Sequence, residues 1–332
     1  MPGRRVLVTG VSSYLGTEIA RGLAVDPSIE YVAGLDDRPP RSRLEGVEFL
    51  EADIRGGRLG ELLPRTGVDT VIHNKIVRRP GPGMSTRVAH EVNVIGTLEL
   101  VAACERSASV AAIVVRGSAG IYGAEPDAPQ FFTEELSRLY TLSTGFQRDV
   151  GEIESLFGAY AQRNRDVVCT MLRYQPAIGP SLDTQITRYL SLPAVPTPLG
   201  FDPRLQLVHE HDAVASTLAA VRTPLRGAIN VAGPGTIGLT RLLRRAGRPA
   251  LPVPAPLFGA VTAASDRLGL ASVSPDLRRL LRYGRAVDTT RLTEEVGFTP
   301  RFSTLEAVED WVRARRGGRR VVAAVGELLP GP

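Results

Sequence analysis

Lysine and cysteine are scarce in this sequence. Lys75 is the only lysine among 332 residues, and arginine supplies the remaining basic side chains of a chain with a formal net charge of +5. The two cysteines, Cys104 and Cys169, both lie in segments with an apolar pattern. We therefore expect buried free thiols, with neither a disulfide nor a cysteine nucleophile. No metal-ligand spacing of His, Cys, Asp or Glu is present, so no metal site is expected.

Long hydrophobic runs and long basic runs are also missing. No stretch of about 18 apolar residues is available to cross a membrane. Residues 1–10 contain no apolar segment ending in a small-residue cleavage site, as a signal peptide would. Arginines are interspersed with acidic residues, and the longest basic cluster, residues 313–320, lies close to the end of the chain. We expect a cytoplasmic protein that binds neither nucleic acid nor membrane.

Short β-rich runs alternate with helical patterns along the first half of the chain. Such alternation predicts a parallel sheet with right-handed crossovers and helices on both faces, which is a Rossmann-like, doubly wound α/β fold. The expected strands are residues 4–10, 31–36, 68–73, 109–115 and 167–174, and the expected helices are residues 14–25, 85–106 and 146–163.

The chain becomes irregular and rich in proline after residue 175. We predict a dinucleotide-binding domain over residues 1–175 and a smaller, mainly substrate-binding region over residues 176–316. Strand-like pieces are expected at residues 205–208 and 227–231, and some elements of the second region are expected to return to the first domain. This region is not expected to form a second independent core. The remaining residues, 317–332, are predicted to be a peripheral tail.

A glycine-rich turn, VLVTGVSSYLG at residues 6–16, follows the first expected strand and opens the first expected helix. Such a turn lets backbone N–H groups and the helix N-terminus bind a pyrophosphate. Gly10 and Gly16 occupy the usual glycine positions, whereas Ser13 replaces the middle glycine. The residues expected to surround the dinucleotide here are Gly10, Ser12, Ser13, Tyr14, Leu15 and Gly16.

The end of the second expected strand bears on the identity of the dinucleotide. Asp36 lies there, 20 residues after Gly16. A carboxylate at this place binds the ribose diol of the adenosine and favours NADH. Arg38, with Arg41 and Arg43, favours NADPH instead, since guanidinium groups bind a 2′-phosphate through their N–H donors. A plain surface turn is the third explanation, and the choice between NADPH and NADH stays open.

Eight segments resemble, in chain order, the motifs of the extended short-chain dehydrogenase/reductases, the NAD-dependent epimerase/dehydratase family. They are VLVTGVSSYLG (6–16), EADI (51–54), VIHNKI (71–76), NVIGTLEL (93–100), GSAGIYG (117–123), LRYQPAIGP (172–180), LVHEHDAV (207–214) and GFTPRFS (297–303). The resemblance covers roughly the whole of residues 4–315. It implies three further sets of cofactor contacts: Asp53 and Ile54 at the adenine, Asn74 and Lys75 beside the phosphates and ribose, and Tyr174, Gln175 and Pro176 beside the nicotinamide.

The sequence departs from this family at its catalytic residues. Ser118 matches the serine that hydrogen-bonds the reacting oxygen, but the tyrosine and lysine positions hold Phe146 and Val150. Because Lys75 is the only lysine, no shift of the alignment recovers the pair. In the family the tyrosine gives a proton to the carbonyl oxygen, and the lysine lowers the pKa of that tyrosine. Phe146 has no proton to give.

Three explanations remain for the missing pair. In the first, the protein is a non-catalytic sensor of the dinucleotide. In the second, another residue replaces the family tyrosine as proton donor, with Tyr122, Tyr140 and Lys75 as candidates. In the third, the substrate supplies its own proton. An aromatic polyketide suits the third explanation, because a phenol beside the ketone is already aligned with it.

The sequence also resembles the atypical ketoreductases of actinobacterial polyketide pathways, in having Phe146 and Val150 in place of the pair. This resemblance implies an NAD(P)H-dependent ketoreductase that reduces an angucyclinone-like ketone in antibiotic biosynthesis, with Ser118 orienting the ketone. A nucleotide-sugar epimerase or dehydratase is the other enzyme considered. The substrate regiochemistry, the product stereochemistry and the oligomeric state stay open.

Overall fold

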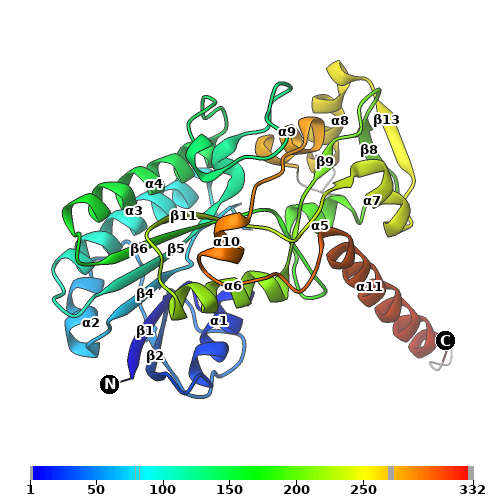
Figure 1. The fold of residues 1–332 in the computed structure, drawn as a ribbon. Coiled ribbons are helices and arrows are strands. Elements are labelled where there is room, and N and C mark those ends of the chain that lie inside the picture. Colours follow the sequence, from blue (N-terminus) through cyan, green and yellow to red (C-terminus); the bar gives the residue numbers. More distant parts are fainter. Residues whose placement is uncertain (1–2, 79, 82, 268–272, 328–332) are drawn as a thin grey trace.

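The structure, a computed structural model, describes residues 3–78, 80–81, 83–267 and 273–327 (Figure 1). A seven-stranded sheet forms its centre, with the strand order β11, β6, β5, β4, β1, β2, β3 and parallel pairing throughout. These strands are β1 (Arg4–Thr9), β2 (Ile29–Asp36), β3 (Val47–Glu51), β4 (Thr70–His73), β5 (Ala112–Ser118), β6 (Val168–Tyr174) and β11 (Gly227–Val231). The predicted Rossmann-like parallel sheet is confirmed.

Helices cover both faces of this sheet (Figure 1). On one face lie α1 (Tyr14–Ala24), α6 (Glu210–Arg222) and α10 (Thr290–Glu294), and on the other lie α2 (Leu59–Thr66), α3 (Thr86–Glu105) and α4 (Gly145–Arg163). Successive residues of a strand point to opposite faces. Val6 and Val8 therefore join the apolar cluster of α1 and α6, while Leu7 joins that of α2, α3 and α4.

Short strands and helices of varied length make up most of the region after β6. They are β7 (Ala177–Ile178), α5 (Gln185–Tyr189), β8 (Val195–Pro198), β9 (Arg204–Leu205), β10 (Val208–His209), β12 (Ile237–Gly238), α7 (Leu239–Ala246), β13 (Ala250–Val253), α8 (Ala255–Arg267), α9 (Pro275–Tyr283) and α11 (Thr304–Glu327). Two short 3₁₀ helices, η1 (Ala119–Tyr122) and η2 (Glu134–Leu136), precede them in the chain. β11 leaves this region and pairs with β6 in the central sheet.

This region has a hydrophobic core of its own, so the expectation that it would lack one is wrong. Its buried side chains all come from residues 178–312 and include Tyr189, Leu242, Leu281 and Trp311. Most of them belong to short strands and helices, and the long helix α11 contributes Ala307, Val308, Trp311 and Val312. The core therefore forms from many small contributions that no single sequence window displays.

Most helices after residue 175 have no counterpart among the expected helices, and three further elements also differ from the pattern expected from sequence. Both β3 and α2 were absent from the expected strands and helices. The third, α11, continues as a helix to Glu327, through most of the segment predicted to be a tail. Residues 328–332 of that segment lie outside the described residues.

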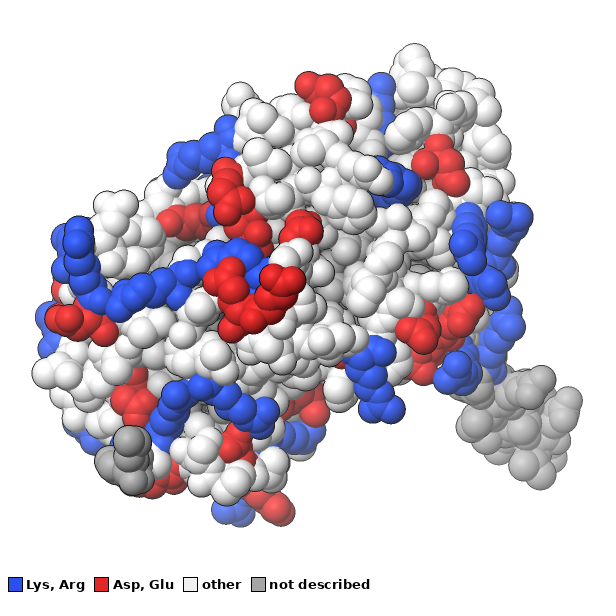
Figure 2. Space-filling view, in the orientation of Figure 1, with Lys and Arg blue, Asp and Glu red and all other residues white. Residues whose placement is uncertain are grey.

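Charged side chains of both signs are interspersed over the face shown in Figure 2. A run of blue groups extends from the left edge toward the centre of this view, with red groups beside both of its ends. Among the described residues, no helix is both long enough and apolar enough to cross a membrane.

Candidate active site

A cleft of about 660 Å³ opens at the carboxyl edge of the central sheet, where residues of α5 and α9 close it. Open α/β sheets bind their ligands at this edge. The predicted site residues that line the cleft are Ser13, Leu15, Ser118, Phe146, Tyr174, Gln175 and Pro176. The other predicted cofactor residues lie at or just beyond the ends of β1 to β4: Gly10, Ser12, Tyr14, Gly16, Asp36, Arg38, Asp53, Ile54, Asn74 and Lys75.

Both glycines of the glycine-rich turn are required by close backbone approaches. Gly10 has a φ of +71°, and a Cβ at Gly16 would lie 2.1 Å from the Gly10 carbonyl oxygen. Ser13 is the N-cap of α1: its Oγ accepts the Gly16 N–H at 3.1 Å and donates to the Gly10 carbonyl at 2.8 Å. The next two N–H groups, those of Tyr14 and Leu15, find no acceptor among the described residues. The start of α1 is thus open to an anion.

Asp36 and Lys75 form one charged cluster at the end of β2. The Asp36 carboxylate accepts the Ser12 N–H at 2.9 Å and the Asp37 N–H at 2.9 Å. The Lys75 ammonium pairs with Asp36, and with Asp37 at 2.6 Å. A carboxylate accepts about four hydrogen bonds, so one position on Asp36 remains for a further donor. The Lys75 ammonium is therefore held by its two ion pairs at the end of β2.

The other residues predicted at this end have local roles as well. The Tyr14 hydroxyl donates to Glu210 at 3.2 Å, and the Asn74 amide donates to the Ser13 hydroxyl at 3.1 Å. Asp53 pairs with the neighbouring Arg55, and Ile54 is buried. The Arg38 side chain is exposed, and its backbone carbonyl accepts a hydrogen bond from Ser12.

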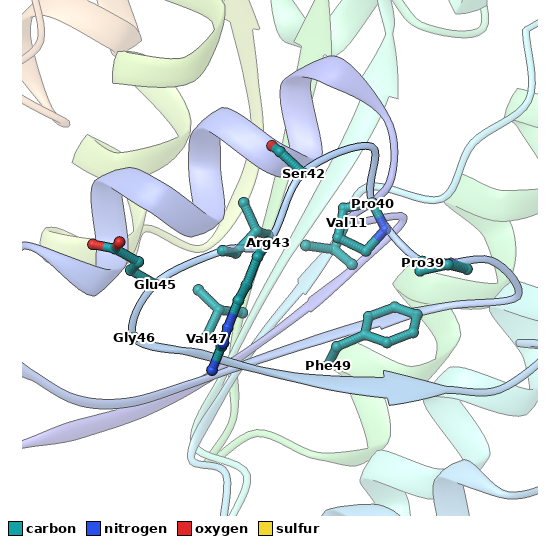
Figure 3. Close-up of a pocket in the computed structure, with 10 residues that line it drawn as sticks. Val11, Pro39, Pro40, Ser42, Arg43, Glu45, Gly46, Val47 and Phe49 are labelled. Carbon is teal, nitrogen blue, oxygen red and sulfur yellow. The ribbon is translucent and has the colours of Figure 1, made fainter.

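A larger cavity, of about 860 Å³, lies beneath the loop that joins β2 to β3 (Figure 3). Val11, Val47 and Phe49 contribute apolar walls, and Arg43 extends across it. None of the strand-end residues near Ser118 lines this cavity. An active site needs several polar groups that converge on one point. We therefore place the active site in the cleft next to Ser118, although the cavity beneath the β2–β3 loop is larger.

Arg78 occupies the catalytic end of the cleft beside Ser118. One of its guanidinium nitrogens, Nη2, donates to Ser118 Oγ at 3.1 Å and lies 3.7 Å from the Asp276 carboxylate. The guanidinium carbon lies 5.2 Å from the centre of the Phe146 ring. Phe146 therefore stands close to Ser118, as the family motif implies, but it supports a guanidinium instead of presenting a phenol. Sequence reasoning missed both Arg78 and Asp276.

Val150 is buried one helical turn after Phe146. It is 2% exposed and packs in a cluster with Ile121 and Phe132. The Thr144 hydroxyl caps α4 and accepts the Gln147 N–H at 3.1 Å, while the Gln147 side chain donates to the Gly120 carbonyl at 3.2 Å. This tie fixes the start of α4 against η1, the segment that directly follows Ser118.

The three substitutes considered for the missing tyrosine lie away from the cleft lining. Tyr122 is buried, donates to Asn230 at 2.7 Å and accepts from Arg173 at 2.9 Å, and burial raises its pKa to about 12. Tyr140 packs edge-on against Phe132. Lys75 belongs to the Asp36 cluster. The hypothesis that one of these residues replaces the family tyrosine is not supported.

Two further guanidinium groups surround the catalytic end, and sequence reasoning missed them too. Arg116, on β5, lines the cleft and lies over the Tyr174 ring, 5.9 Å from its centre. Arg285 is 4% exposed and donates to the Gly123 carbonyl at 3.0 Å and to the Gln175 side chain at 3.4 Å. Burial lowers the pKa of Arg116 and of Arg285 to about 10. Neither residue stands in a motif, so no local sequence signal marks them.

The arrangement supports charge stabilisation at an oxygen atom. Ser118 supplies a hydroxyl and Arg78 supplies N–H donors at one point, which is the composition of an oxyanion site. Asp276 is the carboxylate of this group and is 7% exposed. Among the described residues, no group of three or more His, Cys, Asp and Glu could hold a metal ion.

Comparison with known proteins gives the relationships of the chain. An uncharacterized protein of Mycobacterium tuberculosis is 37% identical over 318 residues, which are 93% of this chain and 84% of that protein. Two solved structures share the fold. A UDP-glucose-4-epimerase of Stenotrophomonas maltophila with bound NAD has a TM-score of 0.74, 18% identity and coverage of 96% of this chain and 99% of that one. MoeE5 in complex with UDP-glucuronic acid and NAD has a TM-score of 0.73, 20% identity and coverage of 95% and 99%.

The family model described as the NAD dependent epimerase/dehydratase family matches residues 6–232. The match runs from β1 to the end of the central sheet and includes the glycine-rich turn, Ser118 and the start of α4. It therefore covers more than half of the chain. This protein belongs to the NAD dependent epimerase/dehydratase family.

Proposed function

We propose that the protein is a ketone reductase that uses NADH or NADPH, with Ser118 and Arg78 in place of the family tyrosine and lysine. One observation carries the proposal: Arg78 donates to Ser118 at 3.1 Å while lying over Phe146. Two hydrogen-bond donors, one of them cationic, therefore meet where the reacting oxygen is expected.

The chemistry of these donors favours reduction over oxidation. When a ketone is reduced, its oxygen gains negative charge, and preorganised N–H and O–H donors stabilise that charge. A guanidinium stays protonated at neutral pH, so it does not remove a proton from an alcohol. Arg78 thus stabilises an alkoxide as it forms, but it cannot act as the base that alcohol oxidation requires.

The glycine-rich turn fits the dinucleotide that this reaction needs. The open N–H groups of Tyr14 and Leu15 suit phosphate oxygens, and Asp36 retains a position for a ribose hydroxyl. Lys75 is paired with Asp36 and Asp37, so it holds the Asp36 carboxylate in place at the ribose end. NADH or NADPH would supply the hydride when bound. The exposed Arg38 keeps the NADPH alternative open.

An aromatic polyketide ketone is the substrate that we propose. Apolar side chains line much of the cleft and suit a flat ring system: Ile76, Phe146, Ile186, Leu277 and Leu280. A phenol beside the ketone would supply the proton that Phe146 lacks. Its alignment with the carbonyl is intramolecular, so no protein acid is needed.

A nucleotide-sugar epimerase or dehydratase is the second candidate, and Asp276 is the observation that favours it. This carboxylate lines the cleft within 3.7 Å of Arg78 and can accept a proton from a sugar hydroxyl. The neighbours bound to UDP-sugars share only the fold with this chain. Net oxidation of an alcohol by this route would need Asp276 as base.

Purified full-length protein incubated with an angucyclinone ketone and either NADPH or NADH separates these functions. We expect alcohol product, a loss of about 10² in turnover for Arg78→Gln, and little change for the control Arg163→Gln, since Arg163 pairs with Glu105 at an exposed site outside the cleft lining. O-methylating the phenol beside the ketone should slow the reaction by about 10² if that phenol gives the proton.

Other outcomes identify the rivals. Isomerised or dehydrated nucleotide sugar that depends on Asp276 would support the second candidate. Cofactor binding without turnover on ketones and nucleotide sugars would support a dinucleotide sensor and would end the reductase proposal.

A further inference from the structure

Arg116 is an unpaired cation in the wall of the cleft. No carboxylate, hydroxyl or carbonyl of a described residue forms a hydrogen bond or ion pair with its guanidinium, and its Nε atom is enclosed without a hydrogen-bond partner. The side chain is half-buried, with its Nε atom enclosed, and a charged group that loses water without gaining partners is costly, since a guanidinium has five N–H donors to satisfy. The residue lies on β5, two positions before Ser118.

Arg78 and Arg285 increase the positive charge around Arg116. Asp276 is shared between them, because it lies 3.7 Å from Arg78 and also attracts Arg285. The Nη2 atom of Arg285 is enclosed without a partner as well. Arg78 repels both other guanidinium groups, which contributes to their lowered pKa after burial. The single carboxylate of Asp276 therefore offsets only part of the positive charge of these three arginines.

The lining of the cleft has an excess of positive charge. Three arginines, Arg78, Arg116 and Arg188, face two aspartates, Asp183 and Asp276, so the formal charge of the lining is +1. Arg285, directly behind Gln175, adds another positive charge. Since Arg188 pairs with Asp183, the excess is concentrated at the Ser118 end. An anion bound there would offset it.

We propose that the substrate carries an acidic group, a carboxylate or a phosphate, that Arg116 and Arg78 bind beside the reacting ketone at Ser118. Guanidinium groups bind these anions through paired N–H donors, and such charge-assisted hydrogen bonds are strong. The apolar residues of the cleft leave room for the carbon skeleton. This inference rests on the proposed ketone reduction for the role of Ser118, and it narrows the substrate to acidic ketones.

Direct binding tests the anion site independently of turnover. Full-length protein is titrated by calorimetry with benzoate and phenyl phosphate as anionic probes and with benzamide as the neutral probe of similar shape. We expect the wild-type protein to bind the anions about tenfold or more tightly than benzamide. Arg116→Gln should remove most of that preference, whereas Arg163→Gln should retain it because Arg163 pairs with Glu105 at an exposed site outside the cleft lining.

A second titration separates the two possible sources of the anion, the substrate and the phosphates of the cofactor. The same probes are added to protein saturated with NADH. Continued binding of the anions, with Arg116→Gln affecting the probes more than NADH, supports a substrate site. Competition between NADH and the probes, with an equal loss of NADH affinity in Arg116→Gln, would assign Arg116 to the cofactor and overturn the proposal.

Two further results complete the test. An unchanged preference for anions in folded Arg116→Gln, verified by its circular dichroism, would also overturn the proposal. Arg116→Lys keeps the charge but loses the planar fork, and we expect it to retain part of the preference. If anions bind as expected while no ketone is reduced, the anion site stands and the proposed reaction fails, so the two failures are distinguishable.

Discussion

A guanidinium next to Ser118 cannot carry out the proton transfers that a tyrosine phenol would carry out in the same place. Arg78 remains charged through the neutral range, whereas a tyrosine can give a proton and later take it back. Val150 adds a second barrier to the ordinary mechanism, because a lysine at this position would lie in the cluster of Ile121 and Phe132. The site is organised to stabilise negative charge, and the return of one phenol would not convert it to the family mechanism.

His73, at the end of β4, is a buried neutral residue beneath the site. Thr97 donates to the Asn93 carbonyl, so its oxygen accepts from the His73 Nε2–H at 3.0 Å, and Thr9 donates to the other ring nitrogen at 3.0 Å. The ring is fully buried, and this burial lowers its pKa from 6.5 to about 4. Protonation would place a second N–H against the Thr9 hydroxyl.

This environment predicts a specific loss of stability in acid. Below about pH 6.5 the unfolded chain takes up a proton that folded His73 does not accept until about pH 4, so the contribution to stability is present above pH 6.5 and is lost as the pH falls. Between pH 7.5 and pH 4.5 the free energy of unfolding should fall by about 2 to 3 kcal/mol from this residue. Urea unfolding of His73→Gln should show a correspondingly flatter dependence on pH.

His90 provides the control for this measurement. Asp149 accepts a hydrogen bond from it and raises its pKa, so His90 stabilises the fold more at low pH and His90→Gln should change the slope in the opposite sense. Equal pH dependence in the wild-type protein and His73→Gln would show that carboxylates alone cause the acid loss.

The sequence predicts the residues that belong to motifs and misses those that do not. Ser118 and Phe146 are found because the GSAGIYG segment and the start of α4 keep their places in the chain. Arg78 comes from the segment after β4, Arg116 from inside β5, Asp276 from α9 and Arg285 from beyond it. Their proximity depends on tertiary packing across some 200 residues of sequence, which no local pattern encodes.

The start of α4 shows how one element positions the site. Thr144 and Gln147 form a capping box, in which Gln147 also accepts the Thr144 N–H at 3.0 Å. The same Gln147 side chain reaches the Gly120 carbonyl of η1. A single cap therefore orders the first turn, the Phe146 ring and the segment after Ser118 together.

Removing this cap should affect stability and activity at once. We expect Thr144→Ala to lower the free energy of unfolding by about 1 kcal/mol, the usual effect of losing an N-cap side chain. It should also reduce turnover on the ketone substrate, since Phe146 would no longer hold Arg78 as firmly. Urea unfolding and steady-state kinetics measure the two effects.

Ser303→Ala is the matched control. Ser303 and Glu306 form the same type of box at the start of α11, away from the cleft. We expect a comparable loss of stability there without loss of turnover. Equal effects of the two substitutions on turnover would contradict a role of the α4 cap in positioning the site.

Within residues 1–175, an edge strand and a short helix were not predicted from the sequence. β3 is an edge strand whose residues are all exposed or half-buried, so VEFLE lacks the apolar run of the inner strands. α2 has eight residues and contains Pro64. Inner strands such as β4, in which every residue is buried, were recognised because burial on both faces demands continuous apolar sequence.

The two regions of the molecule share one of its apolar cores. In the cluster between the sheet and α1 and α6, eight of the 21 buried residues come from beyond residue 175: Val208, Ala213, Ala220, Val221, Ile229, Val231, Leu292 and Val296. Asn230 of β11 also accepts from the Tyr122 hydroxyl, and its own N–H donates to Glu134 at 2.8 Å. The proposed boundary at residue 175 therefore does not divide the chain into two independent folding units.

The consequence is that residues 1–175 should not fold alone. Without β11 and α6, this fragment would expose the edge of β6 and one face of the sheet, and Glu134 and Tyr122 would lose their partner. We expect that urea titration of the fragment, monitored by circular dichroism, shows no cooperative unfolding transition. The full chain cut at the exposed Gly200 turn, through a protease site placed there, is the control. It keeps both halves and should unfold cooperatively, whereas a cooperative transition in the fragment would establish residues 1–175 as an autonomous domain.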